Sequence, residues 1–285
     1  MSPRPVRTLA LLLLSVLLLL AGSSCIGYAN AGTLKSTVDA GGATAVSANF
    51  RLNHGRLEID GGASSLMLGE FTTDDKSDPA VSYSVADQQG MLTVRQTGTQ
   101  SSFDMIPLDR SWTVKMNDEI PLDLTVESGN AHTDLNLDTL TITQLALDAG
   151  SGAASISLDG VQHQLTGVEL HATTGNIDLQ MRGTYDQPRT VEATTMSGDV
   201  KLDLGRDTEA GLSGSVRSAS GAITIAVPRS TGVEIKASTS GTIEVNGLIE
   251  HSNGTYVNSA YGTSKTTVRL TVQSTSGPIT LKLTG

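Results

Sequence analysis

The stretch VELHATTGNIDL, residues 168–179, decides the fold. Apolar residues alternate with polar ones on both sides of Gly175. A period of two places all of these apolar side chains on one face of an extended strand. Glycine accepts positive φ without a Cβ clash, so it suits a sharp corner. The stretch therefore predicts two short strands joined at a glycine corner.

The same corner, a Ser-Gly or Thr-Gly pair between alternating runs, recurs along the chain. Its glycines are Gly129, Gly152, Gly175, Gly198, Gly221, Gly241 and Gly277. The first five are 23 residues apart, and the last two intervals are 20 and 36 residues, as if one coil were trimmed and one carried an insertion. Such a period is the signature of a stacked repeat. The sequence therefore predicts an all-β fold, a single-stranded parallel β-helix or solenoid with 23-residue coils, two or three strands per coil and a shared aliphatic core.

Composition and charge disfavour several classes of binding partner. Aromatic residues make up 3% of the 285 residues, which argues against a stacking platform for bases or sugars. The formal net charge is −10, which disfavours nucleic acid and anionic lipid surfaces. We therefore expect no nucleic-acid partner.

Residues 1–24 have the pattern of an export signal. Arg4 and Arg7 precede an apolar stretch, residues 9–21, that is short for a membrane span. Cys25, the only cysteine, ends the segment AGSSC, which resembles a bacterial lipoprotein box and predicts lipidation of Cys25. Ordinary signal cleavage after Ala31, and secretion, is the alternative.

The chain after the signal divides into three parts. Residues 25–36 are small and polar and predict a flexible tether. Residues 37–120 form an irregular N-terminal β region, and residues 121–285 contain the regular coils and a C-terminal cap.

Several separated blocks carry a family resemblance. They are GRLEIDGGASSLMLGEF (55–71), the strand with Pro79, Val81 and Tyr83, GMLTVRQ (90–96) and GTYVNSAYGTSKTTVRLTVQSTSGPITLKL (254–283). Over residues 34–285 the chain resembles the bacterial toast-rack proteins. The resemblance implies a right-handed β-helix related to adhesin domains of unknown function and to the C-terminal domains of cell-wall-active antibiotic response proteins. The resemblance implies no catalytic residues, because the family has no established ones that could be assigned to positions in this chain.

The histidines and acidic loops predict no metal site. His54, His132, His163, His171 and His251 are scattered, without the spacing of metal ligands. Asp74, Asp75 and Asp78 lack the alternating acidic loop of a calcium site, so a mobile loop is the simpler interpretation. We expect no metal and no cofactor.

Glycan-cleaving β-helices need paired carboxylates on the outward positions of adjacent coils. Three residues after the corners lie His132, Ser155, Asp178, Lys201, Thr224 and Glu244, and five residues after them lie Asp134, Ser157, Gln180, Asp203, Ala226 and Asn246. Neither column stacks acids on successive coils. The sequence therefore favours a protein that is not an enzyme. A polysaccharide-active enzyme that uses Asp178, Lys201 and Asp203 is the alternative.

Tyr256 and Tyr261 lie in the 36-residue interval before the last corner. They indicate a cap over the end of the solenoid, or alternatively a contact patch of exposed tyrosines. Together these features predict an exported, lipid-anchored envelope protein. Its expected role is a noncatalytic scaffold in adhesion or wall-stress sensing, with an unknown envelope protein or glycan as partner.

Overall fold

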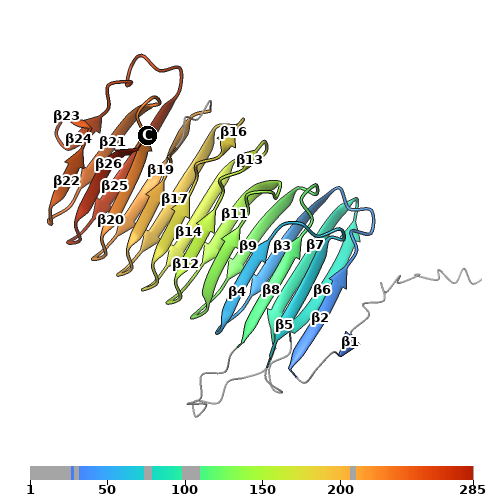
Figure 1. Cartoon of the computed structure of the whole chain (residues 1–285). Helices are drawn as coiled ribbons and strands as arrows, with labels where there is room; N and C mark the ends of the chain where they lie inside the picture. Colours follow the sequence, from blue (N-terminus) through green and yellow to red (C-terminus); the bar gives the residue numbers. More distant parts are fainter. Residues whose placement is uncertain (1–26, 29–31, 74–78, 98–109, 206–209, 285) are drawn as a thin grey trace, which may run out of the picture.

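The computed structural model describes residues 27–28, 32–73, 79–97, 110–205 and 210–284, whose regular elements are all β-strands. Two sheets of 12 strands each face one another, and a third sheet has two strands. Figure 1 shows the strands side by side along one axis, from the blue N-terminal end to the red C-terminal end. The predicted all-β, solenoid-like architecture is confirmed. Within these ranges, no helix is long and apolar enough to cross a bilayer.

Sheets A and B contain the strands in the following spatial order. Sheet A contains β1 (Gly27–Tyr28), β2 (Thr33–Val38), β5 (Met67–Thr72), β8 (Ser111–Met116), β4 (Arg56–Asp60), β10 (His132–Asn136), β12 (Ala154–Ser157), β15 (Ile177–Gln180), β18 (Val200–Asp203), β20 (Ile223–Pro228), β26 (Ile279–Thr284) and β22 (Ile243–Asn246). Sheet B contains β23 (Ile249–Ser252), β24 (Thr255–Val257), β21 (Gly232–Ser238), β25 (Thr267–Ser274), β19 (Leu212–Ser218), β17 (Arg189–Thr195), β14 (Gly167–Ala172), β11 (Ile142–Asp148), β9 (Leu122–Glu127), β3 (Ala45–Arg51), β7 (Gln89–Gln96) and β6 (Pro79–Ala86). The third sheet pairs β13 (Val161–Gln162) with β16 (Thr184–Tyr185). Strand β2 begins inside the segment that was predicted as a tether.

The core lies between sheets A and B and follows the predicted period of two. In β15, Ile177 and Leu179 are buried, whereas Asp178 and Gln180 face outward and are half-buried. The same alternation fills one continuous apolar core with aliphatic side chains from both sheets. Because each coil exposes this face until its neighbours cover it, stacking supplies the stability.

Most coils stack in a constant register, but the first regular one does not. Ile177 of β15 lies beside Ala154 of β12 and beside Val200 of β18, and each of these partners is 23 residues away. Thr133 of β10, however, lies beside Ala154, which is only 21 residues away. Gly129 consequently does not stack on Gly152, although the spacing in sequence is 23.

Two coils lie outside their place in sequence order. The coil β3–β4 lies between β7–β8 and β9–β10, because β3 pairs with both β7 and β9 and β4 pairs with both β8 and β10. At the other end, β25–β26 lies between β19–β20 and β21–β22. The corner intervals of 20 and 36 residues therefore reflect an inserted last coil, rather than a trimmed coil followed by one that carries an insertion.

The corner glycines are required for a different reason from the one predicted. Of the seven, only Gly129 has a positive φ, 49°. A Cβ built on Gly175 would overlap the carbonyl oxygen of Gly152, and one on Gly198 would overlap that of Gly175. The expectation of positive φ along this column is wrong. Glycine is needed there because the backbones of neighbouring coils come into contact.

Antiparallel strands close most of the exposed sheet edges. At the N-terminal end, β5 and then β2 extend sheet A, and β6 extends sheet B. The edge-to-face contact of Phe71 and Trp112, with centroids 5.3 Å apart, fills the core at this end. At the C-terminal end, β24 and β23 extend sheet B, whereas sheet A ends at β22.

Candidate functional site

The outer face of sheet A carries the polar side chains that the sequence put forward as candidates. In register order its central column is Thr113, Glu58, Asp134, Ser155, Asp178, Lys201, Thr224, Thr280 and Glu244. Counting from the corners predicted His132 beside Ser155. The structure places Asp134 there instead, because the register between β10 and β12 is two residues shorter than the corner spacing.

Two acids do lie on adjacent strands of this face, contrary to the expectation from sequence. Glu58 and Asp134 are register partners. Arg56 contacts both, with Nε 2.5 Å from Glu58 Oε1 and Nη2 2.6 Å from Asp134 Oδ2. His132 Nε2 lies 3.3 Å from the same Asp134 oxygen. Sequence order concealed this cluster, because Glu58 belongs to the coil that inserts beside β10.

Next to this cluster, sheet A has a hollow of about 330 Å³. Its floor is formed by two small outward residues, Ala153, which directly precedes β12, and Ser155 of β12. Larger side chains form its walls: His132 of β10 lies on one side, and Asp178 of β15, Lys201 of β18 and the residues directly before these two strands, Asn176 and Asp199, lie on the other. The hollow therefore exists because one strand with small side chains lies between strands with large ones.

The far wall of the hollow is held in place by bonds between coils. Asn176 Oδ1 accepts a hydrogen bond from the Asp199 backbone N–H at 2.9 Å. Asp199 Oδ1 accepts one from the backbone N–H of Ala222 at 2.8 Å, one coil further on. These bonds fix both side chains before any ligand arrives. The sequence signal for them is an Asx residue directly after a corner glycine, and it was not used in the prediction.

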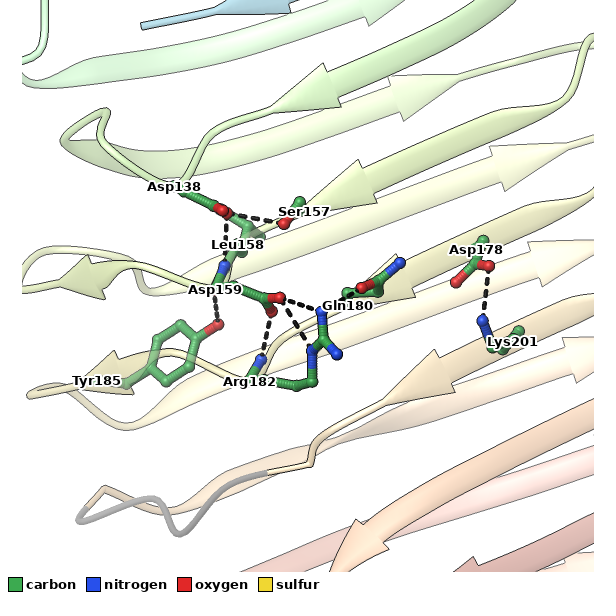
Figure 2. Close-up of polar contacts among 9 residues, drawn as sticks. All are labelled: Asp138, Ser157, Leu158, Asp159, Asp178, Gln180, Arg182, Tyr185 and Lys201. Carbon is green, nitrogen blue, oxygen red and sulfur yellow. Dashed lines mark hydrogen bonds and ion pairs between the residues drawn. The ribbon is translucent and has the colours of Figure 1, made fainter. Parts of the chain in front are cut away.

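Of the three proposed catalytic residues, the structure brings only two together. Figure 2 shows Lys201 Nζ donating to Asp178 Oδ2, at 2.8 Å. The other oxygen of Asp178 is inaccessible to solvent and has no hydrogen-bond partner within the described residues. Asp203 lies in a different column, beside Gln180, and does not line the hollow.

A second polar cluster lies at the opposite end of the same strands (Figure 2). Asp138 Oδ1 accepts hydrogen bonds from the Ser157 hydroxyl and from the Asp159 backbone N–H, at 2.8 and 2.7 Å. Asp159 in turn accepts from Arg182, from its backbone N–H at 2.8 Å and from Nε at 2.9 Å. The Asp159 carboxylate raises the pKa of Arg182 through these bonds. All these groups bind one another across coils, so the cluster links neighbouring coils at this corner.

Behind this corner a tyrosine and an arginine are buried in the core. The Tyr185 hydroxyl donates to the carbonyl oxygen of Leu158 at 2.5 Å, and burial raises its pKa. The Arg189 guanidinium carbon lies 3.8 Å from the centroid of the Tyr185 ring. Arg189 is only 2% exposed, and burial lowers its pKa to about 10. No guanidinium nitrogen has a hydrogen-bond partner within the described residues.

The histidines show no metal-binding arrangement. His163 Nδ1 lies 2.5 Å from Asp186 Oδ2 on the next coil, and His132 contacts Asp134. Among the described residues, no three His, Cys, Asp or Glu side chains are grouped so as to hold a metal ion.

The two C-terminal tyrosines lie at the end of sheet B. Tyr256 belongs to β24, pairs with Ile235 of β21 and packs against the core. The Tyr261 hydroxyl donates to Glu234 Oε1 at 3.0 Å, which raises the pKa of this hydroxyl. Both side chains are half-buried. The role of these two tyrosines, as a cap or as a contact patch, stays a prediction.

Some predictions fall on residues outside the described ranges. They are the export signal 1–24, the lipidation of Cys25, the cleavage after Ala31 and the acidic loop with Asp74, Asp75 and Asp78.

Comparison with known proteins gives similarities of sequence and of fold. Three solved structures resemble the chain: a candidate cell adhesion protein from Clostridium sporogenes, a candidate adhesin from Bacteroides fragilis and one from Parabacteroides merdae. Their identities are 22%, 12% and 14%, and their TM-scores are 0.48, 0.41 and 0.41. The alignments cover 88%, 87% and 87% of this chain and 98%, 95% and 95% of the others.

A search of curated proteins finds no match. Residues 29–180, more than half of the chain, match the N-terminal domain of toast_rack, DUF2154. The chain therefore belongs to the toast-rack family, as the sequence blocks predicted.

Proposed function

We propose that this protein is an exported, lipid-anchored scaffold of the bacterial envelope that binds another envelope component without chemical turnover, in adhesion or wall-stress sensing. The scaffold in this proposal is a right-handed solenoid wound in 23-residue coils. Residues 1–24 act as its export signal and Cys25 carries the lipid. The observation that supports it best is the outer face of sheet A, where fixed polar side chains surround a hollow.

The pairing of charges on this face argues against catalysis. A glycosidase needs one carboxyl group to donate a proton and a second one to attack or to activate water. Here Arg56 binds both Glu58 and Asp134, and Lys201 binds Asp178. Each carboxylate is thus held by a cation of the protein itself.

A polysaccharide-active enzyme remains the second candidate, because Glu58 and Asp134 lie on adjacent strands. Incubating the purified protein with neutral and anionic glycans and measuring the release of reducing ends separates the two. We expect no turnover. Turnover that disappears in Asp178→Ala or Glu58→Gln would overturn the noncatalytic proposal.

Lipid anchoring has a direct test in the producing cell. Replacing Cys25 by serine removes the thiol that would carry the lipid, so we expect the protein to move from the membrane fraction to the soluble exported fraction. One acyl chain binds membranes only marginally, and stable anchoring takes a second signal, such as a further acyl chain. Mass spectrometry of the parent protein supplies the check: a mature N-terminus at Gly32 would contradict lipidation.

A further inference from the structure

The hollow on sheet A has the chemistry of a sugar-binding site. We propose that it binds a neutral, hydroxyl-bearing glycan chain, with Ser155 at its floor and Asn176, Asp178, Asp199 and Lys201 as its polar wall. This inference rests on the proposed function and names the ligand class of that scaffold.

The shape of the hollow fits a single sugar chain. Its floor is one strand wide, so β10 and β15 on either side lie about 10 Å apart, twice the usual strand spacing. The Ala153 methyl group contributes apolar lining, against which the C–H face of a sugar ring can pack, whereas the side chains of Ala154 and Ile177 point into the core. The backbone of β12 is already paired on both sides, with β10 and β15, so an extended peptide could not join the sheet here. Recognition must come from side chains.

The wall offers donors and acceptors in similar numbers. Within the described residues, Asn176 uses its oxygen and keeps its amide N–H groups, and Lys201 keeps two of its three N–H donors. Asp199 uses one carboxylate oxygen within the protein and has no bond to the other within the described residues. Ser155 can both donate and accept. A hydroxyl group also does both, so a ring with several hydroxyls matches this inventory.

Asp178 adds a specific demand for a donor. One of its oxygens binds Lys201 and the other has no partner, which is costly for an inaccessible carboxylate oxygen. A sugar hydroxyl that reaches this oxygen would supply the missing hydrogen bond.

Charge selects the class of glycan. Asp178 and Lys201 balance one another, and Asp199 leaves the wall with an excess negative charge. Asp134 and Glu58 lie just beyond it, neutralised only in part by Arg56. An anionic glycan would be repelled, whereas a neutral one is not affected. No aromatic ring lines the hollow, so the affinity of one site is low and many copies on a surface would act together.

The test uses the full-length exported protein, purified in detergent and titrated calorimetrically with four neutral hexasaccharides, of glucose, mannose, galactose and N-acetylglucosamine, and with an oligogalacturonate. We expect at least one neutral hexasaccharide to bind more tightly than the anionic one. Ser155→Leu, which fills the floor, should abolish this binding. Thr224→Leu, on the same face but outside the hollow, should leave it unchanged.

A second variant tests the donors without filling the hollow. Asn176→Asp keeps the oxygen that caps the next coil but removes the amide N–H groups, so we expect binding at least tenfold weaker at an unchanged melting temperature. The inference is overturned if all four neutral hexasaccharides fail to bind, if the oligogalacturonate binds more tightly, or if Ser155→Leu binds like Thr224→Leu. The proposed scaffold function would survive these results if the protein still captured an envelope partner through another face.

Discussion

At the scale of single residues, the corner glycines define how closely the coils can stack. The position of Gly175 leaves no volume for a side chain, because the carbonyl oxygen of Gly152 occupies it. The spacing of strands in a sheet is fixed by hydrogen bonds, so neither coil can withdraw to make room. Any side chain at this position must therefore distort the corner.

Gly175→Ala should destabilise the protein by about 3 kcal/mol or more, since overpacking against fixed backbone has no cheap relief. Gly211→Ala is the matched control, because among the described residues its Cβ would meet only the Thr267 carbonyl oxygen, at 3.6 Å. Thermal unfolding followed by circular dichroism measures both. Equal melting temperatures for the two variants would contradict the contact described at the corner.

Burying the charged guanidinium group of Arg189 costs free energy of folding. Burial depresses its pKa to about 10, so the folded protein holds this proton less tightly than the unfolded chain does. Below pH 10 Arg189 is charged in both the folded and the unfolded protein, so the burial of this charge destabilises the fold by its full amount. The destabilisation lessens only as the pH rises above that value. The contact with the Tyr185 ring offsets part of it.

Arg189→Met should therefore stabilise the protein by about 1–2 kcal/mol, because an apolar side chain of similar length removes an unpaired buried charge. Arg182→Met is the control with the opposite expectation, since Arg182 is exposed and bound to Asp159. Urea denaturation at pH 7 compares them. A lower midpoint for Arg189→Met would show that the guanidinium stabilises the core.

At the scale of strands, the order of the coils is the main feature that differs from the sequence. Parallel strands with the same alternation fit beside one another in any order, so periodicity alone cannot show that β25 lies between β19 and β21. The antiparallel strand β24 makes the arrangement possible, because it takes the sheet edge that β21 would otherwise leave open.

Pairs of cysteines can test this order directly. Arg217 of β19 and Gln273 of β25 are register partners on the outer face, and Ser238 of β21 lies beside Gln273. In a Cys25→Ser background, Arg217→Cys with Gln273→Cys should form a disulfide on mild oxidation. Arg217→Cys with Ser238→Cys should not, because these positions are two strands apart and beyond the reach of a disulfide. A disulfide in the Arg217→Cys, Ser238→Cys pair but not in the Arg217→Cys, Gln273→Cys pair, seen on a non-reducing gel, would mean that the coils stack in sequence order.

Much of the strand pattern could be read from the sequence, and much of the site could not. The alternation around Gly175 predicts β14 and β15 because side-chain period depends only on local residues. The Glu58–Asp134 pair depends on which coil lies beside β10, a long-range choice that leaves no local trace. The hollow depends in addition on the two-residue register difference between β10 and β12, which equal glycine spacing concealed.

At the scale of the whole molecule, the two ends are built differently. Sheet A begins with β1 and β2, so Gly27, two residues after Cys25, already lies at the N-terminal end of the solenoid. An anchor on Cys25 would hold that end at the membrane. Sheet A would then extend away from the bilayer, and its hollow would be accessible from the side.

The coil β25–β26, which is synthesised last, also determines when the molecule can finish folding. Residues 267–284 must enter between strands that were synthesised before them, so β20 and β22 have no shared neighbour until the chain is complete. A chain that leaves the cytoplasm N-terminus first would keep this gap open throughout its passage. The coil β25–β26 would thus take its place only after the whole chain has crossed, although the coils before it can stack without it.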